Sequence, residues 1–211
     1  MKWSWWGSGV SYGEARQRQL AHREGIWAGS ESECLALLEH SSVITVGRRA
    51  AEGLPGVDEL KEHGIAFETT ERGGLATYHG PGQLVAYTLV NVRERGIKVR
   101  CLVDALEESC IRFLATHSVQ AQRKPGAPGV WVGEQKIAAV GLHFSRGVSI
   151  HGLALNLCPD LSAYQWISPC GFDAETMTSL KALTGEEVHP REAASSLAEI
   201  LMKCIEDAGC P

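Results

Sequence analysis

Apolar residues change their spacing along the chain, and these changes predict both helices and strands. A polar stretch over 11–28, with Tyr12 among its few apolar anchors, predicts a surface helix. Apolar residues from Val99 to Leu114 recur every three or four positions, which predicts an amphipathic helix. A similar stripe follows Pro190, a residue type that is favoured in the first turn of helices. Helices are therefore expected near the start, in the middle and at the end of the chain.

Short apolar or alternating runs between these helices predict β-strands. They cover residues 34–38, 43–46, 65–70, 84–90, 130–132, 136–144 and 148–157. The tryptophan-rich residues 1–6 suggest either the start of another strand or a lid over a groove. Strands and helices do not alternate strictly, which disfavours a doubly wound βαβ fold. We predict an α/β (α+β) fold in which helices flank a mixed, largely antiparallel sheet. The length of 211 residues suits a single domain over 1–211.

A glycine-dense stretch, Arg72–Gln83, interrupts the predicted strands. It combines four glycines and a proline with Thr77, Tyr78 and His79. Flexible spacers are usually built from glycine and serine, without arginine or aromatic residues. Glycine also lets the backbone adopt positive φ and approach a bound molecule closely. We interpret the stretch as a binding loop held by a rigid scaffold, with a purely structural turn as the alternative.

Charge and composition exclude several functional classes. The net charge of −5 argues against a protein that binds nucleic acid mainly through phosphates. No stretch reaches the eighteen apolar residues that a membrane span needs, and no signal peptide is evident. Residues 93–100 carry four cations and one anion, which indicates a solvated face or a docking patch for an acidic partner. We expect a cytoplasmic protein that binds neither nucleic acid nor membrane.

The cysteines suggest one candidate nucleophile. Their number, seven, is odd, and no Cys-x-x-Cys pair occurs, so neither a disulfide framework nor a zinc ribbon is indicated. Cys101, Cys110 and Cys204 fall in predicted helices, where a small buried residue is the default interpretation. Cys170 differs because it stands between Pro169 and Gly171. A rigid residue on one side and a flexible one on the other can present a single sulfur at a fixed place.

Lys136 strengthens that hypothesis. In an alternating strand it shares a face with apolar residues such as Ala138 and Val140. Desolvation on such a face favours the neutral form of a lysine. Beside a cysteine, the ammonium form stabilises a thiolate and the neutral amine accepts the thiol proton. The alternative is a lysine at a strand end whose amine reaches water.

Two of the eight histidines stand out by their position. His79 lies in the glycine-dense stretch, and His151 begins the run His-Gly-Leu-Ala-Leu-Asn. Structural histidines or walls of a substrate pocket are the favoured interpretations. A metal site formed by His40, His79, His151 and Cys170 is less favoured, because no spacing matches a zinc motif. We therefore predict no metal site.

Taken together, these blocks resemble the lipoyl(octanoyl) transferases of the biotin/lipoate protein ligase superfamily. The matching segments are 37–40, 46–48, 72–85, 129–132, 136–141, 151–156, 160–161 and 169–171, in the order and approximate spacing of the family. The resemblance covers most of residues 11–182 and implies the mixed sheet flanked by helices of that superfamily's catalytic domain.

The resemblance also implies roles for individual residues. Cys170 matches the family's nucleophile, and Lys136 matches the lysine that promotes ionisation of that thiol. The substrate pocket carries over to three segments. They comprise Arg72, Gly73, Gly74, Leu75, Ala76, Thr77, Tyr78 and His79, then Ala139, Val140 and Gly141, and finally Gly152, Leu153 and Ala154.

The implied reaction moves an octanoyl group from octanoyl-acyl carrier protein, through a cysteine thioester, to a lysine of a lipoyl domain. Expected acceptors are the lipoyl domains of 2-oxoacid dehydrogenase acyltransferase subunits and the glycine cleavage H protein. Transfer from a thioester requires no ATP and no cofactor. Two alternatives remain open, an ATP-dependent lipoate–protein ligase and a module that binds acyl chains without turnover.

Overall fold

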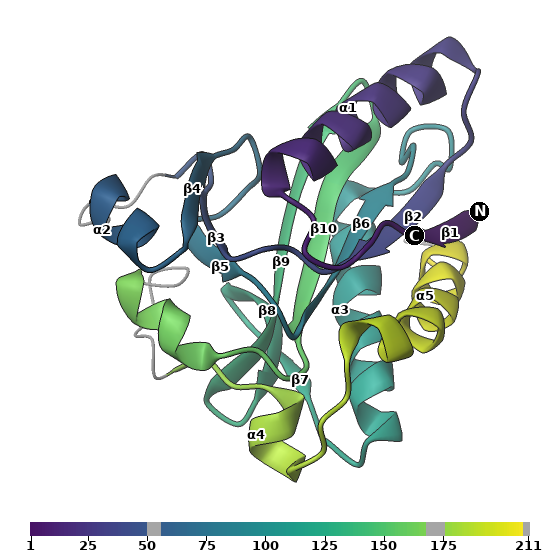
Figure 1. Ribbon diagram of the computed structural model, residues 1–211. Coiled ribbons are helices and arrows are strands. Elements are labelled where there is room, and N and C mark those ends of the chain that lie inside the picture. The colour runs from purple at the N-terminus through teal and green to yellow at the C-terminus, as the bar shows by residue number, and fades with distance from the viewer. Residues whose placement is uncertain (50–55, 168–175, 209–211) are drawn as a thin grey trace.

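The computed structural model describes residues 1–49, 56–167 and 176–208, and it is built on one large sheet. The strand order is β1-β2-β6-β10-β9-β8-β7, with β6 and β10 near the centre (Figure 1). The strands span Lys2–Trp5 (β1), Cys34–Leu38 (β2), Gln83–Leu89 (β6), Val148–Asn156 (β10), Gln135–Ser145 (β9), Ala127–Val132 (β8) and Gln122–Lys124 (β7). Every neighbouring pair is antiparallel except the parallel pair β1 and β2. The prediction of a mixed, largely antiparallel sheet is confirmed.

Helices cover both faces of the large sheet (Figure 1). On one face lie α3 (Val99–Thr116) and α5 (Pro190–Glu206), which pack against each other, and on the other lies α1 (Tyr12–Ala28). Alternation along each strand divides the side chains between these layers. In β2, Leu35 and Leu37 belong to the core beneath α3 and α5, whereas Ala36 and Leu38 belong to the core beneath α1. Each buried leucine contributes on the order of 2 kcal/mol through removal of apolar surface from water.

A second, smaller sheet stands beside the large one (Figure 1). It consists of β4 (Ala66–Thr69), β3 (Val43–Val46) and β5 (Ala76–His79), with β3 parallel to β4 and antiparallel to β5. The short helices α2 (Val57–Glu62) and α4 (Leu180–Thr184), and the 3-10 helix η1 (Leu161–Trp166), complete the described elements. Tyr164 and Ile167 pack into the core of the small sheet.

The helix boundaries follow their capping residues. Ser11 accepts a hydrogen bond from the backbone of Glu14 at the start of α1. Gly29 ends that helix in the left-handed conformation that glycine favours. Pro190 occupies the first turn of α5, where His189 and Glu192 form a capping box, as the sequence predicted for the proline. The short elements α2, α4 and β7 were not predicted, because a few residues carry too little periodicity.

One sequence-based expectation is wrong. The stretch Arg72–Gln83 is not a continuous loop, since Ala76–His79 forms β5. Pairing with β3, in which Val43 faces His79 and Val46 faces Ala76, overrides the loop tendency of the flanking glycines. Cys101 is buried, as its place in a predicted helix led us to expect, and it is also disulfide-bonded, a pairing that sequence spacing does not reveal. The other described cysteines, at positions 34, 110, 158 and 204, are free.

The approach of β10 to β6 leaves no room for a side chain at Gly152. A Cβ atom there would lie 2.0 Å from the carbonyl oxygen of Ala86. We expect Gly152→Ala to lower the free energy of unfolding by about 1–3 kcal/mol or more, because rigid backbone has to move. Urea unfolding measures this change. Gly13→Ala is the control, since its Cβ would meet nothing closer than 3.9 Å and alanine favours a helix. Equal stability of the two variants would contradict the prediction.

Candidate active site

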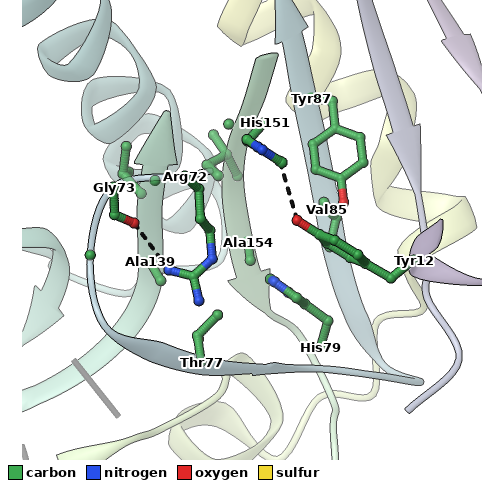
Figure 2. A pocket seen from close by; sticks show the side chains of 15 residues that line it. Tyr12, Arg72, Gly73, Thr77, His79, Val85, Tyr87, Ala139, His151 and Ala154 are labelled. Atoms are coloured by element: carbon green, nitrogen blue, oxygen red, sulfur yellow. Dashed lines mark hydrogen bonds between the residues drawn. The ribbon is translucent and has the colours of Figure 1, made fainter. Parts of the chain in front are cut away.

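A pocket of about 460 Å³, partly open to solvent, lies between the two sheets and the start of α1 (Figure 2). Of the predicted pocket residues, it is lined by Arg72, Gly73, Gly74, Thr77, His79, Ala139, Val140, Gly141, Gly152, Leu153 and Ala154. Two of these groups are paired in register, because Gly141 faces Gly152, Val140 faces Leu153 and Ala139 faces Ala154 across β9 and β10. Segments far apart in the sequence thus form one continuous wall.

Three predicted pocket residues lie elsewhere. The alternation of β5 directs Thr77 and His79 toward the pocket, whereas Ala76 and Tyr78 pack in the core of the small sheet. Leu75 lines a neighbouring groove instead. The resemblance marked the segment as a whole, and only the strand alternation separates its two faces.

Three further residues line the pocket without having been predicted to do so: Tyr12, Val85 and Tyr87. Tyr12 was interpreted as an apolar anchor of a surface helix, yet it is buried at the pocket end. In the sequence, the only feature that could have indicated a place in the pocket was an aromatic residue with a hydroxyl in the first turn of a polar helix. His151 was singled out as a possible pocket wall, and it occupies that place.

Arg72 fixes the glycine turn rather than reaching into solvent. Its guanidinium donates to the backbone oxygen of Thr45 at 2.6 Å, to the Thr45 hydroxyl at 2.9 Å and to the Gly73 oxygen at 3.0 Å. The Gly73 amide in turn donates to the Leu142 oxygen of β9 at 3.0 Å. The turn therefore bridges the small sheet, which contains Thr45, and the large sheet, which contains Leu142.

A cluster of aromatic side chains closes one end of the pocket (Figure 2). The Tyr12 ring stacks between His79 and His151, with ring centres 6.2 and 6.3 Å away and interplanar angles of 8°. The Tyr12 hydroxyl lies 3.3 Å from Nδ1 of His151. His40 stands behind, with its ring centre 5.5 Å from that of Tyr12.

Hydrogen bonds determine the protonation of His40. Its Nδ1 lies 2.8 Å from the Val10 carbonyl oxygen, which can only accept, so Nδ1 carries the proton. Its Nε2, 2.6 Å from the Tyr87 hydroxyl, is then the acceptor. Burial lowers the pKa of His40 to about 4 and lowers the pKa values of His79 and His151 as well. Burial also raises the pKa of Tyr12 to about 12. The cluster is therefore polar but uncharged near neutral pH.

His151 has an unusual backbone. Its φ of 63° lies in the left-handed region, which residues other than glycine adopt rarely. Gln19 of α1 compensates, since its side-chain oxygen accepts the His151 amide proton at 2.7 Å. A carboxylate oxygen of Glu71 lies 3.7 Å from Nε2 of His151. The contact with His151, and to a smaller extent the contact with Arg16, holds the pKa of this carboxylate below its usual range. This carboxylate favours a proton on Nε2, which leaves Nδ1 to accept from Tyr12.

Lys136 lies beside the pocket, at the start of β9. It is only 3% exposed, so it does not extend into water as the alternative interpretation supposed. Its amine sits 5.6 Å from the centre of the Trp131 ring, within the range of a cation–π contact. The groove that it lines shares Gly73, Gly74, Val140 and Gly141 with the pocket, so the two hollows adjoin.

Cys170 lies outside the described residues. The chain that follows its segment is described, and it runs next to Lys136. Met177 forms a parallel bridge with Lys136, and the Thr178 amide donates to the Lys136 carbonyl oxygen at 3.0 Å. The proposed nucleophile is thus seven residues before a residue paired with the proposed lysine.

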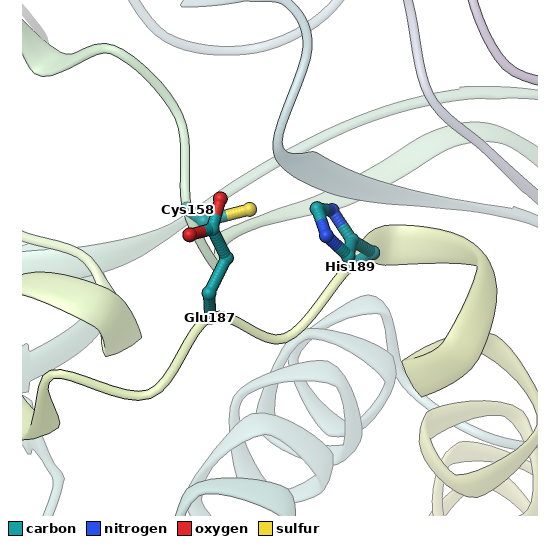
Figure 3. Close-up of side chains that lie close together, drawn as sticks. All are labelled: Cys158, Glu187 and His189. Atoms are coloured by element: carbon teal, nitrogen blue, oxygen red, sulfur yellow. The ribbon is translucent and has the colours of Figure 1, made fainter.

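Another group of candidate metal ligands lies away from the pocket. Ligand atoms of Cys158, Glu187 and His189 lie within 4.8 Å of one another, and no other such group occurs among the described residues (Figure 3). Each side chain already has a partner. Cys158 donates to the Val188 oxygen at 3.4 Å, Glu187 pairs with Lys181 at 2.8 Å and His189 caps α5. The group is explained by local packing.

No helix within the described ranges is long and apolar enough to cross a membrane.

The buried histidines predict a loss of stability in weak acid. An unfolded histidine has a pKa of about 6.5, whereas His40, His79 and His151 remain neutral in the fold. Below about pH 6.5 the unfolded chain therefore binds protons that the folded chain does not, and folding stability falls as the pH falls. For His40 this loss continues to about pH 4. Each histidine lowers the free energy of unfolding by at most about 1.4 kcal/mol for each unit by which the pH falls.

Urea unfolding at pH 7.5, 6.5, 5.5 and 5.0 measures this slope. His40→Gln should reduce the change of the free energy of unfolding with pH by up to about 1.4 kcal/mol per pH unit, the contribution of one histidine. The variant is also expected to be less stable than wild type at pH 7.5. A free energy of unfolding that stays constant between pH 6.5 and 5.0 would contradict the prediction.

Comparison with known proteins places this fold and pocket in context. The octanoyltransferase of Solibacter usitatus (strain Ellin6076) is 48% identical over 176 residues, which cover 82% of this chain and 80% of that protein. Lipoate-protein ligase A bound with ATP superposes with a TM-score of 0.74 at 17% identity, covering 95% of this chain and 85% of that one. A bi-partite lipoate protein ligase from Thermoplasma acidophilum superposes with a TM-score of 0.69 at 17% identity, covering 97% of this chain and 83% of that one.

At these low identities the two solved structures support the fold alone. The family model described as the lipoyl protein ligase A/B catalytic domain matches residues 14–202, which include every strand that lines the pocket. Because this match extends over most of the chain and agrees with the octanoyltransferase relative, the chain belongs to the lipoyl protein ligase A/B catalytic domain family.

Proposed function

We propose that the chain is an octanoyltransferase that works through a thioester on Cys170, with Lys136 as its proton carrier. The observation that carries the proposal is the position of Lys136. This buried amine stands beside a pocket with an aliphatic wall and a neutral aromatic end, and its backbone pairs with the chain that follows Cys170. The 48% identical octanoyltransferase supports the choice of acyl group.

In the first half-reaction, Cys170 takes the octanoyl group from a thioester donor. Its thiol proton passes to Lys136, and the sulfur attacks the carbonyl carbon. The carbon–sulfur bond to the donor breaks, and the departing thiolate takes a proton from the Lys136 ammonium. One thioester replaces another, so the step needs no ATP.

In the second half-reaction, the amine of a target lysine attacks the octanoyl-Cys170 thioester. A carbon–nitrogen bond forms, and the bond to the Cys170 sulfur breaks. Lys136 accepts the proton that the amine loses and returns it to the cysteine. The resulting amide is more stable than the thioester, which makes transfer favourable.

The pocket suits the apolar part of such a substrate. Ala139, Val140 and Leu153 supply an aliphatic wall, and Gly141 and Gly152, which lack side chains, leave room beside it for an extended chain. The aromatic cluster offers neutral hydrogen-bonding groups, so no charged partner is demanded there. The guanidinium of Arg72 in the lining is bonded to Thr45 and Gly73, so the aliphatic wall is the surface that favours an unbranched fatty acyl group.

The donor in this proposal is octanoyl-acyl carrier protein, and the acceptors are lipoyl domains. The cationic run at 93–100 remains a candidate docking patch for an acidic partner. Arg95 is engaged by Glu33 at 2.6 Å, and Arg100 lies 3.8 Å from Asp104. Arg93, Lys98 and Arg100 are all exposed. Any contribution to docking falls mainly on these exposed side chains.

The nucleophile is tested by intact mass spectrometry after incubation with octanoyl-acyl carrier protein. Wild type should gain one octanoyl group that hydroxylamine removes, and Cys170→Ala should gain none. Cys158→Ala is the control, because burial raises the pKa of this free thiol and makes it a poor nucleophile. An adduct that persists in Cys170→Ala would overturn the assignment. Transfer that occurs only with ATP and free octanoate would instead indicate a ligase.

Lys136→Met keeps the length and apolar stem of the side chain but removes the amine. We expect the rate of acyl-enzyme formation to fall by about 100-fold or more, since general acid–base catalysis is lost. Lys124→Met is the matched control, because Lys124 also stands over Trp131, 4.8 Å from the ring centre, but outside the pocket. Equal rates for wild type and Lys136→Met in a single-turnover assay would contradict the role.

A further inference from the structure

Two buried side-chain amides meet where β6 begins, at Gln83, and β10 ends, at Asn156. Gln83 and Asn156 are register partners, and each is only 1% exposed. They form neither wall of the pocket nor part of the proposed chemistry. Buried amides without full hydrogen bonding are costly, so their partners indicate what they hold in place.

Backbone carbonyls determine how both amides are oriented. The Gln83 nitrogen lies 3.2 Å from the Tyr78 oxygen, and the Asn156 nitrogen lies 3.0 Å from the Thr178 oxygen. Carbonyl oxygens can only accept, so each nitrogen is the donor. The Gln83 nitrogen then donates to the Asn156 side-chain oxygen at 2.9 Å. The Gln83 oxygen, 2.7 Å from Nδ1 of His79, accepts a proton from that ring.

These bonds connect the pocket with Lys136. From His79 they run through Gln83 and Asn156 to the carbonyl of Thr178, whose amide donates to the Lys136 carbonyl at 3.0 Å. The wall of the pocket and the start of β9 are thus joined without a break. The path passes through two side chains, Gln83 and Asn156, and Asn156 is the one that reaches Thr178.

The same amide also holds a residue on the other side of Cys170 in sequence. The Tyr164 hydroxyl donates to the Asn156 side-chain oxygen at 3.3 Å, and its oxygen lies 3.1 Å from the Gln83 nitrogen. Tyr164 precedes Cys170, and Thr178 follows it. Asn156 therefore contacts one described residue before and one after the stretch that contains the proposed nucleophile.

We propose that Asn156 is a positioning residue that sets where the Cys170-bearing stretch starts and ends relative to Lys136 and the pocket. The inference rests on the proposed function. A nucleophile and a proton acceptor must be held within tenths of an ångström for efficient transfer, and small displacements cost large factors in rate. Asn156 acts through Tyr164 and Thr178 and does not line the pocket.

Asn156→Ala tests the proposal in the full-length protein. We expect single-turnover formation of the octanoyl-enzyme to slow by about tenfold or more. The dissociation constant for octanoate should change by less than about threefold, because the pocket walls are intact. The pH at which Cys170 reaches half its maximal alkylation rate with iodoacetamide should also shift, since the distance between the thiol and Lys136 changes.

Asn91→Ala is the matched control. Asn91 is a buried amide at the opposite end of β10, where it bridges Val148, and its side-chain oxygen accepts from the Glu94 amide. It should lose comparable stability but keep the wild-type rate and alkylation profile once rates are corrected for folded protein. If both variants lose rate only in proportion to their folded fraction, Asn156 is merely structural and the inference fails.

Tyr164→Phe provides the decision if Asn156→Ala does not fold, because it removes one hydroxyl and keeps the ring. Its acylation rate should fall several-fold with octanoate binding unchanged, and a wild-type rate overturns the inference. Failure of wild type itself to form an octanoyl-enzyme would reject the proposed function instead. The two outcomes are therefore separated by the wild-type reaction.

Discussion

The pairing of β10 with β6 on one side and β9 on the other determines the rest of the site. Gly152 allows the backbones of β10 and β6 to approach so closely that a Cβ atom would meet the Ala86 oxygen. The same register places Gly152 opposite Gly141 and Asn156 opposite Gln83. A slip by one residue would reverse which side chains face the pocket and which face α3 and α5. The aliphatic wall, the aromatic end and the amide pair all depend on this alignment.

The elements with clear periodicity could be predicted from the sequence. The stripe in α3, the proline at the start of α5 and the alternation of β9 and β10 are local signals, and the structure follows them. The class of sheet could also be predicted from the irregular order of strands and helices. The segment at β5 could not, because its glycine-rich flanks conceal a strand that exists only through pairing with β3.

The pocket likewise contains residues that could be predicted from the sequence and residues that could not. Residues 139–141 and 152–154 were identified through a family resemblance, and the strand register explains why they form one wall. Tyr12 was missed because one residue in a polar helix carries no sign of the sheet face on which that helix rests. The connection from His79 to Lys136 was equally hidden, since it joins residues up to about a hundred positions apart through backbone carbonyls. Cys170 stays a prediction from sequence, because it lies outside the described residues.

The turn at Arg72 and Gly73 makes the pocket an interface between two sheets. One side of this turn is bonded to Thr45 of the small sheet and the other to Leu142 of the large sheet. The separation of the sheets, and with it the width available to a ligand, therefore depends on a threonine that does not line the pocket. An engineer who wants this scaffold to accept a different acyl group can therefore vary Thr45, because its hydroxyl accepts from the guanidinium that holds the turn and yet lies outside the lining of the pocket.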